Sequence, residues 1–283
     1  MPRPLCAALF KTNAMILVTG AGGTLGRRVL LDMERASIEA LAWLRRPDPG
    51  QHAKNCCFGD LRTLPELLGP GLRPDRLLHL ASSGDAEQEM QVLDAVLKLA
   101  AGRQLQHLVY VSILGVNRSS YPYYRLKFRQ EQVLSASGLP YTVVRLSQFH
   151  EFVLQRILRA CPLPAAAAWE LPSGLHFQSI DLSDASRFLL QVLGGEPAFG
   201  VLERGGPRWL NLEQMVPAYL QRLGKSNKPR YLPLQDPLYE VFRSGINRTE
   251  AGLGEGRSWE EFLAGQDPQD LRLRHPEQKQ LRR

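Results

Sequence analysis

Tyr123 and Lys127 stand four residues apart, a spacing that places two side chains on one face of a helix. A nearby ammonium group stabilises a tyrosinate and lowers the pKa of a phenol from its ordinary value of about 10. The pair therefore predicts an acid–base site that exchanges a proton with a carbonyl oxygen. The alternative is plain packing, because Tyr121 and Tyr124 crowd the same stretch and a lysine stem often lies along aromatic rings.

A second candidate site is the glycine-rich stretch MILVTGAGGTLG, which runs from Met15 to Gly26. Glycine allows a tight turn, lets backbone N–H groups approach a pyrophosphate, and lets a helix pack closely on a strand. The N-terminus of the following helix then faces the anion. The alternative is a glycine-rich turn without a ligand. We expect a bound dinucleotide, with contacts from Thr19, Gly20, Gly22, Gly23, Thr24, Leu25 and Gly26.

The residues after the next apolar run indicate which dinucleotide is bound. An NAD-selective chain usually carries an acidic residue there, about 20 residues past the glycines, that accepts from the ribose 2′-hydroxyl. This chain has Arg45 and Arg46 instead. Guanidinium groups match a 2′-phosphate with charge-assisted hydrogen bonds, so the sequence predicts NADP(H). Two solvated surface arginines are the other interpretation.

Alternating apolar runs and helix-periodic segments position these residues. Strands are expected at 16–18, 39–44, 55–58, 76–82, 107–113 and 141–146, and helices at 24–36, 90–100 and 123–137. This alternation is typical of βαβ units. We therefore predict an α/β fold, a Rossmann-like doubly wound parallel sheet followed by a smaller, irregular C-terminal part.

The regular alternation ends near residue 152, which sets the expected domains. Residues 15–152 are predicted to form the NAD(P)-binding core, 153–265 a part that packs on it and forms the substrate pocket, and 266–283 a mobile tail. Residues 1–14 precede the first expected strand as an appendage.

Composition narrows the function classes. The net charge of +7 is scattered rather than gathered in a basic stripe, so no nucleic-acid partner is expected. No apolar run approaches the ~18 residues of a membrane span, and we expect a cytoplasmic protein. The histidines, His150 among them, show no metal-ligand spacing, so no metal is expected. His150 itself could relay protons, but a lone histidine there is more often a structural hydrogen-bonding residue.

Several motifs in order resemble one known group. They are VTGAGGTLG, GDL at 59–61, LVYVSILGV at 108–116, YYRLK at 123–127, SGLPYTVVR at 137–145 and QFHEF at 148–152. Over residues 15–265 the chain is similar to NmrA-like NAD(P)-binding proteins of the atypical short-chain dehydrogenase/reductase superfamily. The resemblance implies an extended Rossmann fold, bound NADP(H), and either a quinone or carbonyl reductase or a catalytically silent redox sensor.

The resemblance also implies further contacts. Arg45 would hold the 2′-phosphate, and Tyr123 with Lys127 would be the catalytic pair. The usual catalytic hydroxyl corresponds to Ser112, but Ile113 and Leu114 follow it, which puts its placement and efficient catalysis in doubt. The remaining implied contacts are Asp60 and Leu61 at the adenine, Ala81, Ser82 and Ser83 at the ribose, and Gln148 and Phe149 at the nicotinamide.

Two functions follow from these residues. The first is an NADPH-dependent oxidoreductase that passes hydride to a small-molecule quinone or carbonyl substrate, with Tyr123 as proton donor, Lys127 tuning it and Ser112 as the third catalytic candidate. The second is a non-catalytic NADP(H)-binding regulator that acts through protein partners. A sugar-nucleotide epimerase shares the fold but retains NAD, against which Arg45 and Arg46 argue.

Overall fold

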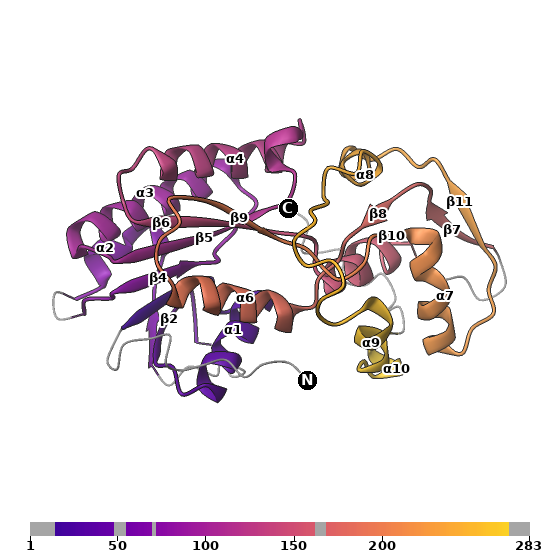
Figure 1. Cartoon of the computed structure of the whole chain (residues 1–283), viewed down its shortest axis with the longest axis horizontal. Coiled ribbons are helices and arrows are strands. Elements are labelled where there is room, and N and C mark those ends of the chain that lie inside the picture. The colour runs from indigo at the N-terminus through magenta and orange to yellow at the C-terminus, as the bar shows by residue number, and fades with distance from the viewer. Residues whose placement is uncertain (1–14, 48–54, 70–71, 162–167, 272–283) are drawn as a thin grey trace. The chain divides into compact units, whose positions relative to one another are not determined.

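The computed structural model describes residues 15–47, 55–69, 72–161 and 168–271. The chain divides into two compact units (Figure 1). Unit 1 holds the chain up to Leu146 together with Leu182–Arg204, and unit 2 holds Ser147–Asp181 together with the chain from Gly205 onward. Among the described residues, no helix is both long and apolar enough to cross a membrane.

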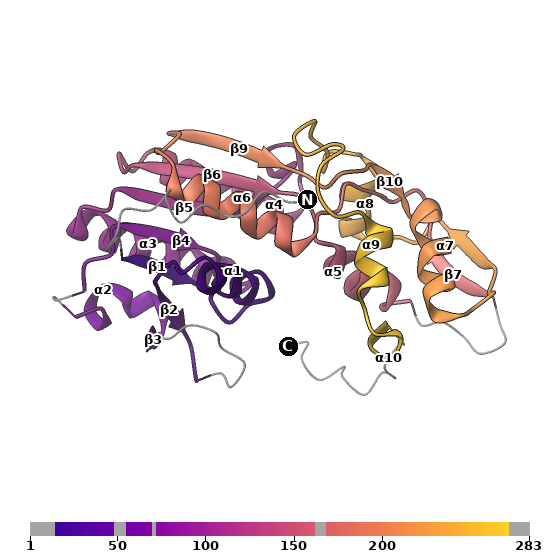
Figure 2. The ribbon, with the colours of Figure 1, turned by 60° about the horizontal axis from the view of Figure 1, so that its bottom comes forward.

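Unit 1 is built on a seven-stranded sheet in the order β3-β2-β1-β4-β5-β6-β9, whose neighbouring strands are all parallel. Figure 2 shows this order from β9 at one edge to β3 at the other. The strands are β1 (Ile16–Thr19), β2 (Ala40–Leu44), β3 (Asn55–Phe58), β4 (Arg76–His79), β5 (His107–Ile113), β6 (Tyr141–Leu146) and β9 (Gly200–Arg204). The predicted α/β doubly wound fold is confirmed.

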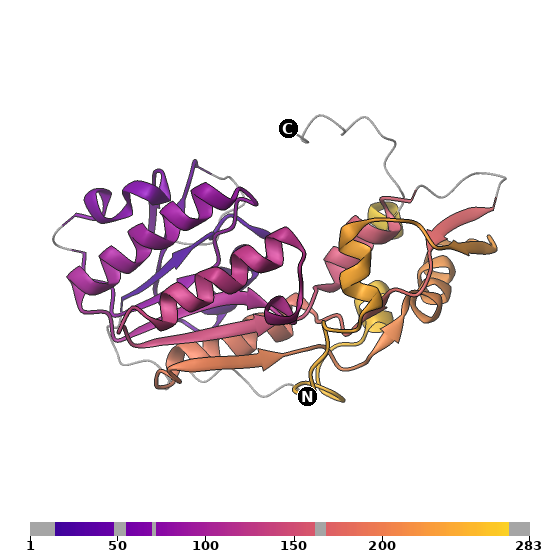
Figure 3. The same cartoon turned by 90° about the horizontal axis from the view of Figure 1, so that it is seen from above.

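Helices cover both faces of this sheet. Figure 1 shows α3 (Ala86–Arg103) and α4 (Pro122–Ser135) above it, and α1 (Thr24–Arg35) and α6 (Leu182–Gly194) below it. Figure 3, seen from above, shows α3 and α4 lying across the strands. The short α2 (Leu64–Leu67) and the 3₁₀ turns η2 (Leu61–Thr63) and η3 (Val116–Arg118) complete the unit. Apolar side chains from the β1, β2, β4, β5 and β6 strands pack with those of α3 in a buried core.

The structure divides the chain differently from the expected boundary at residue 152. After an excursion into unit 2 the chain returns to unit 1, where α6 packs against α1 and β9 pairs in parallel with β6. The backbone hydrogen bonds that β9 forms along the free edge of β6 hold it in the sheet. Sequence periodicity carries no information about the sheet to which this segment returns.

Unit 2 consists of short elements. They are α5 (His150–Phe152), the π-helical η4 (Val153–Leu158), β7 (Trp169–Pro172), β8 (His176–Phe177), β10 (Leu210–Asn211), α7 (Leu212–Leu223), β11 (Pro229–Leu232), α8 (Pro237–Arg243), α9 (Trp259–Ala264) and α10 (Pro268–Leu271). β8 pairs antiparallel with β10, and β7 pairs in parallel with β11. A capping box of Ser258 and Glu261 begins α9.

The start of the expected tail is ordered. Leu271 on α10 is fully buried, and its carbonyl accepts a hydrogen bond of 2.9 Å from the hydroxyl of Tyr219. The first residues of the expected tail therefore contact α7 through Leu271. Residues 272–283 and 1–14 lie outside the described residues.

Two buried histidines make unit 1 sensitive to acid. Burial, with the nearby Lys127 charge, lowers the pKa of His79 to about 3, and burial together with Arg76 lowers the pKa of His107 to about 4. Both folded-state values lie below the 6.5 of the unfolded chain, so the unfolded state binds more protons as pH falls below 6.5. We expect each histidine to reduce the free energy of unfolding by about 1.4 kcal/mol per pH unit from pH 6.5 toward its folded value.

Urea unfolding from pH 7 to pH 4.5 measures this slope. His79→Gln keeps a side chain that can bond to the Thr19 hydroxyl, 2.6 Å from His79 Nδ1 in the wild type, but it removes the titration. We expect the variant to lose about half of the slope. An unchanged slope would show that His79 does not stay neutral in the fold.

Candidate functional site

The glycine turn between β1 and α1 has room for no side chain at two positions. Gly20 has a φ of +70°, and a Cβ placed on it would lie 2.5 Å from the backbone nitrogen of Ala81. A Cβ on Gly26 would lie 2.3 Å from the carbonyl oxygen of Gly20. Gly23 is also tight, since its Cβ would lie 3.2 Å from that same oxygen. The turn therefore brings backbone groups together where any larger residue would separate them.

The N-terminus of α1 opens on this turn. Its N-cap is Gly23, which has no side chain to cap the helix, and the first turn carries no acidic residue. Gly23 and Thr24 are exposed. An uncapped helix N-terminus with its partial positive charge is a binding site for an anion such as a pyrophosphate. The cradle therefore fits the predicted dinucleotide.

The buried side chains of Thr19 and Leu25 lie at the two ends of the glycine turn. Thr19 is fully buried, and its hydroxyl lies 2.6 Å from His79 Nδ1. Leu25 is 8% exposed on the inner face of α1. The carbonyl of Gly22 accepts a 3.0 Å hydrogen bond from Arg27 Nε. These residues hold the turn in shape.

The two arginines follow β2 at the same edge of the sheet as the glycine turn. Thr19 at the end of β1 pairs with Trp43 near the end of β2, and Arg45 and Arg46 come directly after this strand with exposed side chains. Carboxyl ends of adjacent parallel strands lie together, and there the ribose of a Rossmann dinucleotide is recognised. The predicted 2′-phosphate contacts thus directly follow the strand next to the cradle.

Asp60 is already paired with an arginine that sequence reasoning missed. Its carboxylate accepts from the backbone nitrogen of Arg62 at 2.9 Å and from the Arg62 guanidinium at 2.5 to 3.1 Å. These bonds, with a smaller effect of the Arg45 charge, lower the pKa of Asp60 to about 2. Leu61 is buried. Asp60 therefore stays ionised and places a third guanidinium near Arg45.

The loop after β4 is organised by Glu89, another residue that the sequence did not indicate. One carboxylate oxygen of Glu89 accepts from the Ser82 hydroxyl at 2.6 Å and from the backbone nitrogens of Ser83 and Gly84 at 2.9 Å each. Glu89 is 3% exposed in the first turn of α3, while Ser82 and Ser83 are exposed and Ala81 is half-buried. The predicted ribose loop therefore takes its shape from a buried carboxylate.

Tyr123 is bonded to this loop. Its hydroxyl lies 2.7 Å from the hydroxyl of Ser82. Burial raises the pKa of Tyr123 to about 12; the Ser82 hydrogen bond offsets part of this rise and the charge of Glu89 adds to it. The expectation that a neighbouring ammonium lowers this pKa is wrong.

The Lys127 ammonium has hydrogen-bond and ion-pair partners other than Tyr123. Lys127 is 4% exposed, donates a 3.0 Å hydrogen bond to the hydroxyl of Tyr110, and has its Nζ 3.8 Å from Glu89 Oε2. Burial lowers the pKa of Lys127, and the charges of Glu89 and Glu131 oppose that effect. Although Tyr123 and Lys127 share a helix, the lysine points to β5 and α3 partners.

Ser112 is enclosed in the central sheet. It lies within β5 opposite Arg145 of β6, is 2% exposed, and its hydroxyl has no hydrogen-bond partner among the described residues. A hydroxyl enclosed in the sheet is not presented to a substrate. The structure therefore brings Ser82, not Ser112, to the hydroxyl of Tyr123.

Gln148, Phe149 and His150 belong to unit 2. Gln148 is 7% exposed, and its Oε1 accepts a 3.0 Å hydrogen bond from the fully buried Asn247. Phe149 forms a parallel bridge to Ile180. These contacts position the two predicted nicotinamide residues within their own unit.

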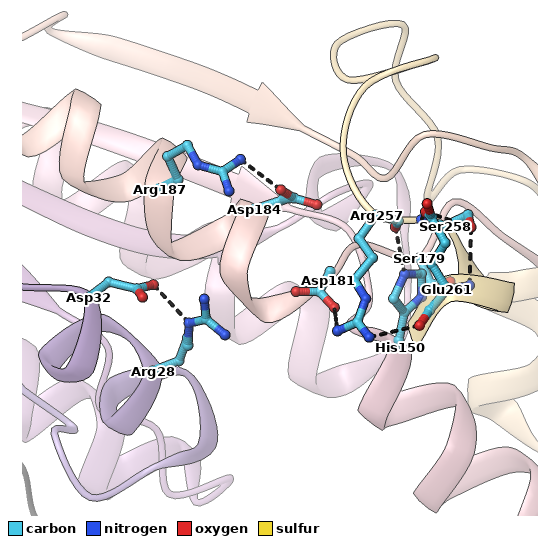
Figure 4. A network of polar contacts seen from close by, with 10 residues as sticks. All are labelled: Arg28, Asp32, His150, Ser179, Asp181, Asp184, Arg187, Arg257, Ser258 and Glu261. Carbon is cyan, nitrogen blue, oxygen red and sulfur yellow. Dashed lines mark hydrogen bonds and ion pairs between the residues drawn. The ribbon is translucent and has the colours of Figure 1, made fainter. Parts of the chain in front are cut away.

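His150 has a structural environment. Its Nδ1 lies 2.8 Å from the Ser179 hydroxyl and its Nε2 3.1 Å from the carbonyl oxygen of Arg257, as Figure 4 shows. Its ring packs against Trp259 and Phe262 at centroid distances of 5.7 and 5.1 Å. The structural interpretation of His150 is therefore the one that fits. Among the described residues, no group of three or more acidic, histidine or cysteine side chains is placed to hold a metal ion.

Comparisons with known proteins agree with this site. A family model described as NAD(P)H-binding matches residues 20–152. The photosystem II assembly factor Ycf39 of Guillardia theta is 26% identical over 266 residues, 88% of this chain and 82% of that protein. Ycf39 of Cyanophora paradoxa is 27% identical over 191 residues. That second match covers 63% of this chain and only 59% of the algal protein.

Solved structures share the fold. NADPH-dependent quinone oxidoreductase QOR2 of Escherichia coli, in complex with NADPH, has a TM-score of 0.67 at 20% identity, covering 88% of this chain and 99% of that one. UDP-glucose 4-epimerase of Thermotoga maritima has a TM-score of 0.69 at 17% identity, covering 88% and 96%. Residues 20–152 are thus similar to the NAD(P)H-binding family, in agreement with the resemblance of this chain to NmrA-like, atypical short-chain dehydrogenase/reductase proteins.

Proposed function

We propose that this protein is an NADPH-dependent oxidoreductase whose small-molecule acceptor is a quinone or another conjugated carbonyl compound. The observation that carries the proposal is the glycine cradle at an uncapped helix N-terminus, together with two exposed arginines that directly follow the adjacent strand. Gly20, Gly23 and Gly26 would hold the pyrophosphate. NADPH, when bound, supplies the hydride.

Arg45 and Arg46 are proposed to select the phosphorylated dinucleotide. We expect the double variant Arg45→Ala/Arg46→Ala to bind NADPH about 10- to 100-fold more weakly, because it loses charge-assisted hydrogen bonds to the 2′-phosphate. Its affinity for NADH should change less than about threefold. Fluorescence titration of both nucleotides measures the ratio, and Arg129→Ala, an exposed arginine on α4, is the control. Equal weakening for both nucleotides would contradict a role in phosphate selection.

The environment of Tyr123 favours one class of acceptor. With a pKa near 12 this phenol is a hydrogen-bond donor rather than a strong acid. Hydride addition to a quinone gives a phenolate, whose conjugate acid has a pKa near that of tyrosine, about 10. Addition to a simple ketone gives an alkoxide, nearer to hydroxide in basicity, at about 15.7. A quinone therefore depends least on an acidic partner.

Loss of NADPH absorbance in the presence of quinones, conjugated dyes, aldehydes and ketones tests this function. We expect turnover of NADPH with quinones and little turnover with simple ketones. Turnover of ketones alone would contradict the assignment of acceptor class.

The second candidate is a non-catalytic NADP(H)-binding regulator that acts through protein partners. Two observations favour it: Lys127 is buried against Tyr110 and Glu89 rather than beside Tyr123, and relatives of this chain are named as assembly factors. Tight NADPH binding without turnover of any acceptor in the same assay would select this candidate.

A further inference from the structure

A chain of hydrogen bonds runs from Tyr123 into the protein. The Tyr123 hydroxyl lies 2.7 Å from Ser82 Oγ, and Ser82 Oγ lies 2.6 Å from Glu89 Oε1. The chain joins three elements, since Tyr123 is on α4, Ser82 follows β4 and Glu89 is on α3. None of the three residues adjoins another in sequence, so the contact is a product of the fold.

The number of protons fixes the direction of this chain. An ionised carboxylate only accepts hydrogen bonds, and a serine hydroxyl has a single proton to donate. Ser82 therefore donates to Glu89 and accepts from Tyr123. In the free protein the Tyr123 proton points to Ser82; during reduction the phenol must turn this proton to the acceptor, and Ser82 then donates to the phenol oxygen.

Glu89 is enclosed at the inner end of this chain of hydrogen bonds. It is 3% exposed, and its second oxygen, Oε2, has no hydrogen-bond partner among the described residues but lies 3.8 Å from the Lys127 ammonium. This ammonium compensates the buried negative charge. At the other end Ser82 is exposed, so water can exchange protons with its hydroxyl.

We propose that Ser82, held in position by the Glu89 carboxylate, relays protons between Tyr123 and solvent, with Ser82 in the role that the family resemblance assigns to Ser112. This inference rests on the proposed oxidoreductase function. Because one proton arrives at Tyr123 as another leaves, no tyrosinate has to accumulate. Lys127 then acts on Glu89, and through it on Tyr123.

Protons and electrons balance in both directions of the proposed reaction. In reduction, the acceptor takes a hydride and the Tyr123 proton, Tyr123 takes the Ser82 proton, and Ser82 takes a proton from solvent water, to which it is exposed. The acceptor gains two electrons and two hydrogens, solvent loses one proton, and Glu89 stays a carboxylate that accepts from Ser82. In oxidation, the substrate hydroxyl gives its proton to Tyr123 and the same transfers run through Ser82 to solvent.

Titration of the Tyr123 phenol tests the chain without cofactor or acceptor. Tyrosinate absorbance after rapid pH jumps gives the Tyr123 midpoint by difference from Tyr123→Phe. We expect Ser82→Ala to raise the midpoint, because the tyrosinate then loses the hydrogen bond that the Ser82 hydroxyl donates to it, and Glu89→Gln/Lys127→Met to lower it, because the Glu89 charge is lost. Ser135→Ala and Glu87→Gln, both exposed, should leave it unchanged. Shifts in the same direction, or none, would overturn the relay.

Steady-state kinetics with NADPH and a quinone give the second readout. We expect Ser82→Ala to lower kcat at least 10-fold with KM for NADPH within about twofold, and Ser82→Thr, which keeps the hydroxyl, to restore most of kcat. Full kcat in Ser82→Ala would overturn the relay while the oxidoreductase function stands. If the wild-type protein turns over no acceptor, the oxidoreductase function is wrong, and so is the relay as part of catalysis. The Tyr123 titration still shows in that case whether the hydrogen-bonded chain exists.

Discussion

Gly26→Ala is expected to weaken NADPH binding at least 100-fold. The added methyl group would lie 2.3 Å from the carbonyl oxygen of Gly20 and 2.8 Å from the Cα of Ala21, and both are backbone atoms that cannot rotate away. The turn must open to accept it, which moves the amide groups that would hold the pyrophosphate. Overpacking of this kind also costs about 1–3 kcal/mol of folding stability.

The matched control is Gly102→Ala. Gly102 lies near the C-terminal end of α3, and a Cβ placed on it would meet nothing within 4 Å. Alanine is the better helix former, so this variant should keep its affinity and unfold at the same temperature or slightly above. Calorimetric titration with NADPH compares the two. Wild-type affinity in a folded Gly26→Ala would show that the turn does not hold the nucleotide.

Lys127→Met is expected to lower the free energy of unfolding by about 3–5 kcal/mol, the range for removing one partner of a buried ion pair. The Lys127 and Glu89 side chains are 6% and 3% exposed, and the variant leaves the carboxylate of Glu89 enclosed without its counter-charge. It also removes the 3.0 Å hydrogen bond to the Tyr110 hydroxyl. Chemical denaturation at pH 7 measures the loss.

Two further variants show whether the ion pair is the cause. Adding Glu89→Gln to Lys127→Met removes the uncompensated charge and should recover most of the stability. Lys98→Met breaks an exposed pair with Asp94, whose side chains are 69% and 62% exposed, and should leave stability nearly unchanged. If Lys127→Met and Lys98→Met are equally mild, the buried pair does not stabilise unit 1.

The sequence was sufficient for the parts of the site that depend on the backbone. Gly20 and Gly26 follow a strand and begin a helix, and this local order alone predicts a turn that excludes side chains. Arg45 and Arg46 end the next strand, and parallel strands place their carboxyl ends together. Such features need only periodicity and chain order.

The parts that depend on distant side chains could not be predicted. Lys127 shares a helix with Tyr123, but its partners Tyr110 and Glu89 come from β5 and α3, and those contacts change its role. Ser82 reaches Tyr123 across 41 residues of sequence. The return of β9 to the sheet is equally non-local, since a run of five residues pairs with β6 after the excursion into unit 2.

The most direct test of NADP(H) binding is titration of the purified wild-type protein with NADPH, NADP⁺, NADH and NAD⁺. Calorimetry and nucleotide fluorescence measure the binding. We expect saturable binding of one nucleotide per chain, with NADPH and NADP⁺ bound at least 10-fold more tightly than NADH and NAD⁺. A folded protein that gives no response to any of the four at millimolar concentration would contradict it.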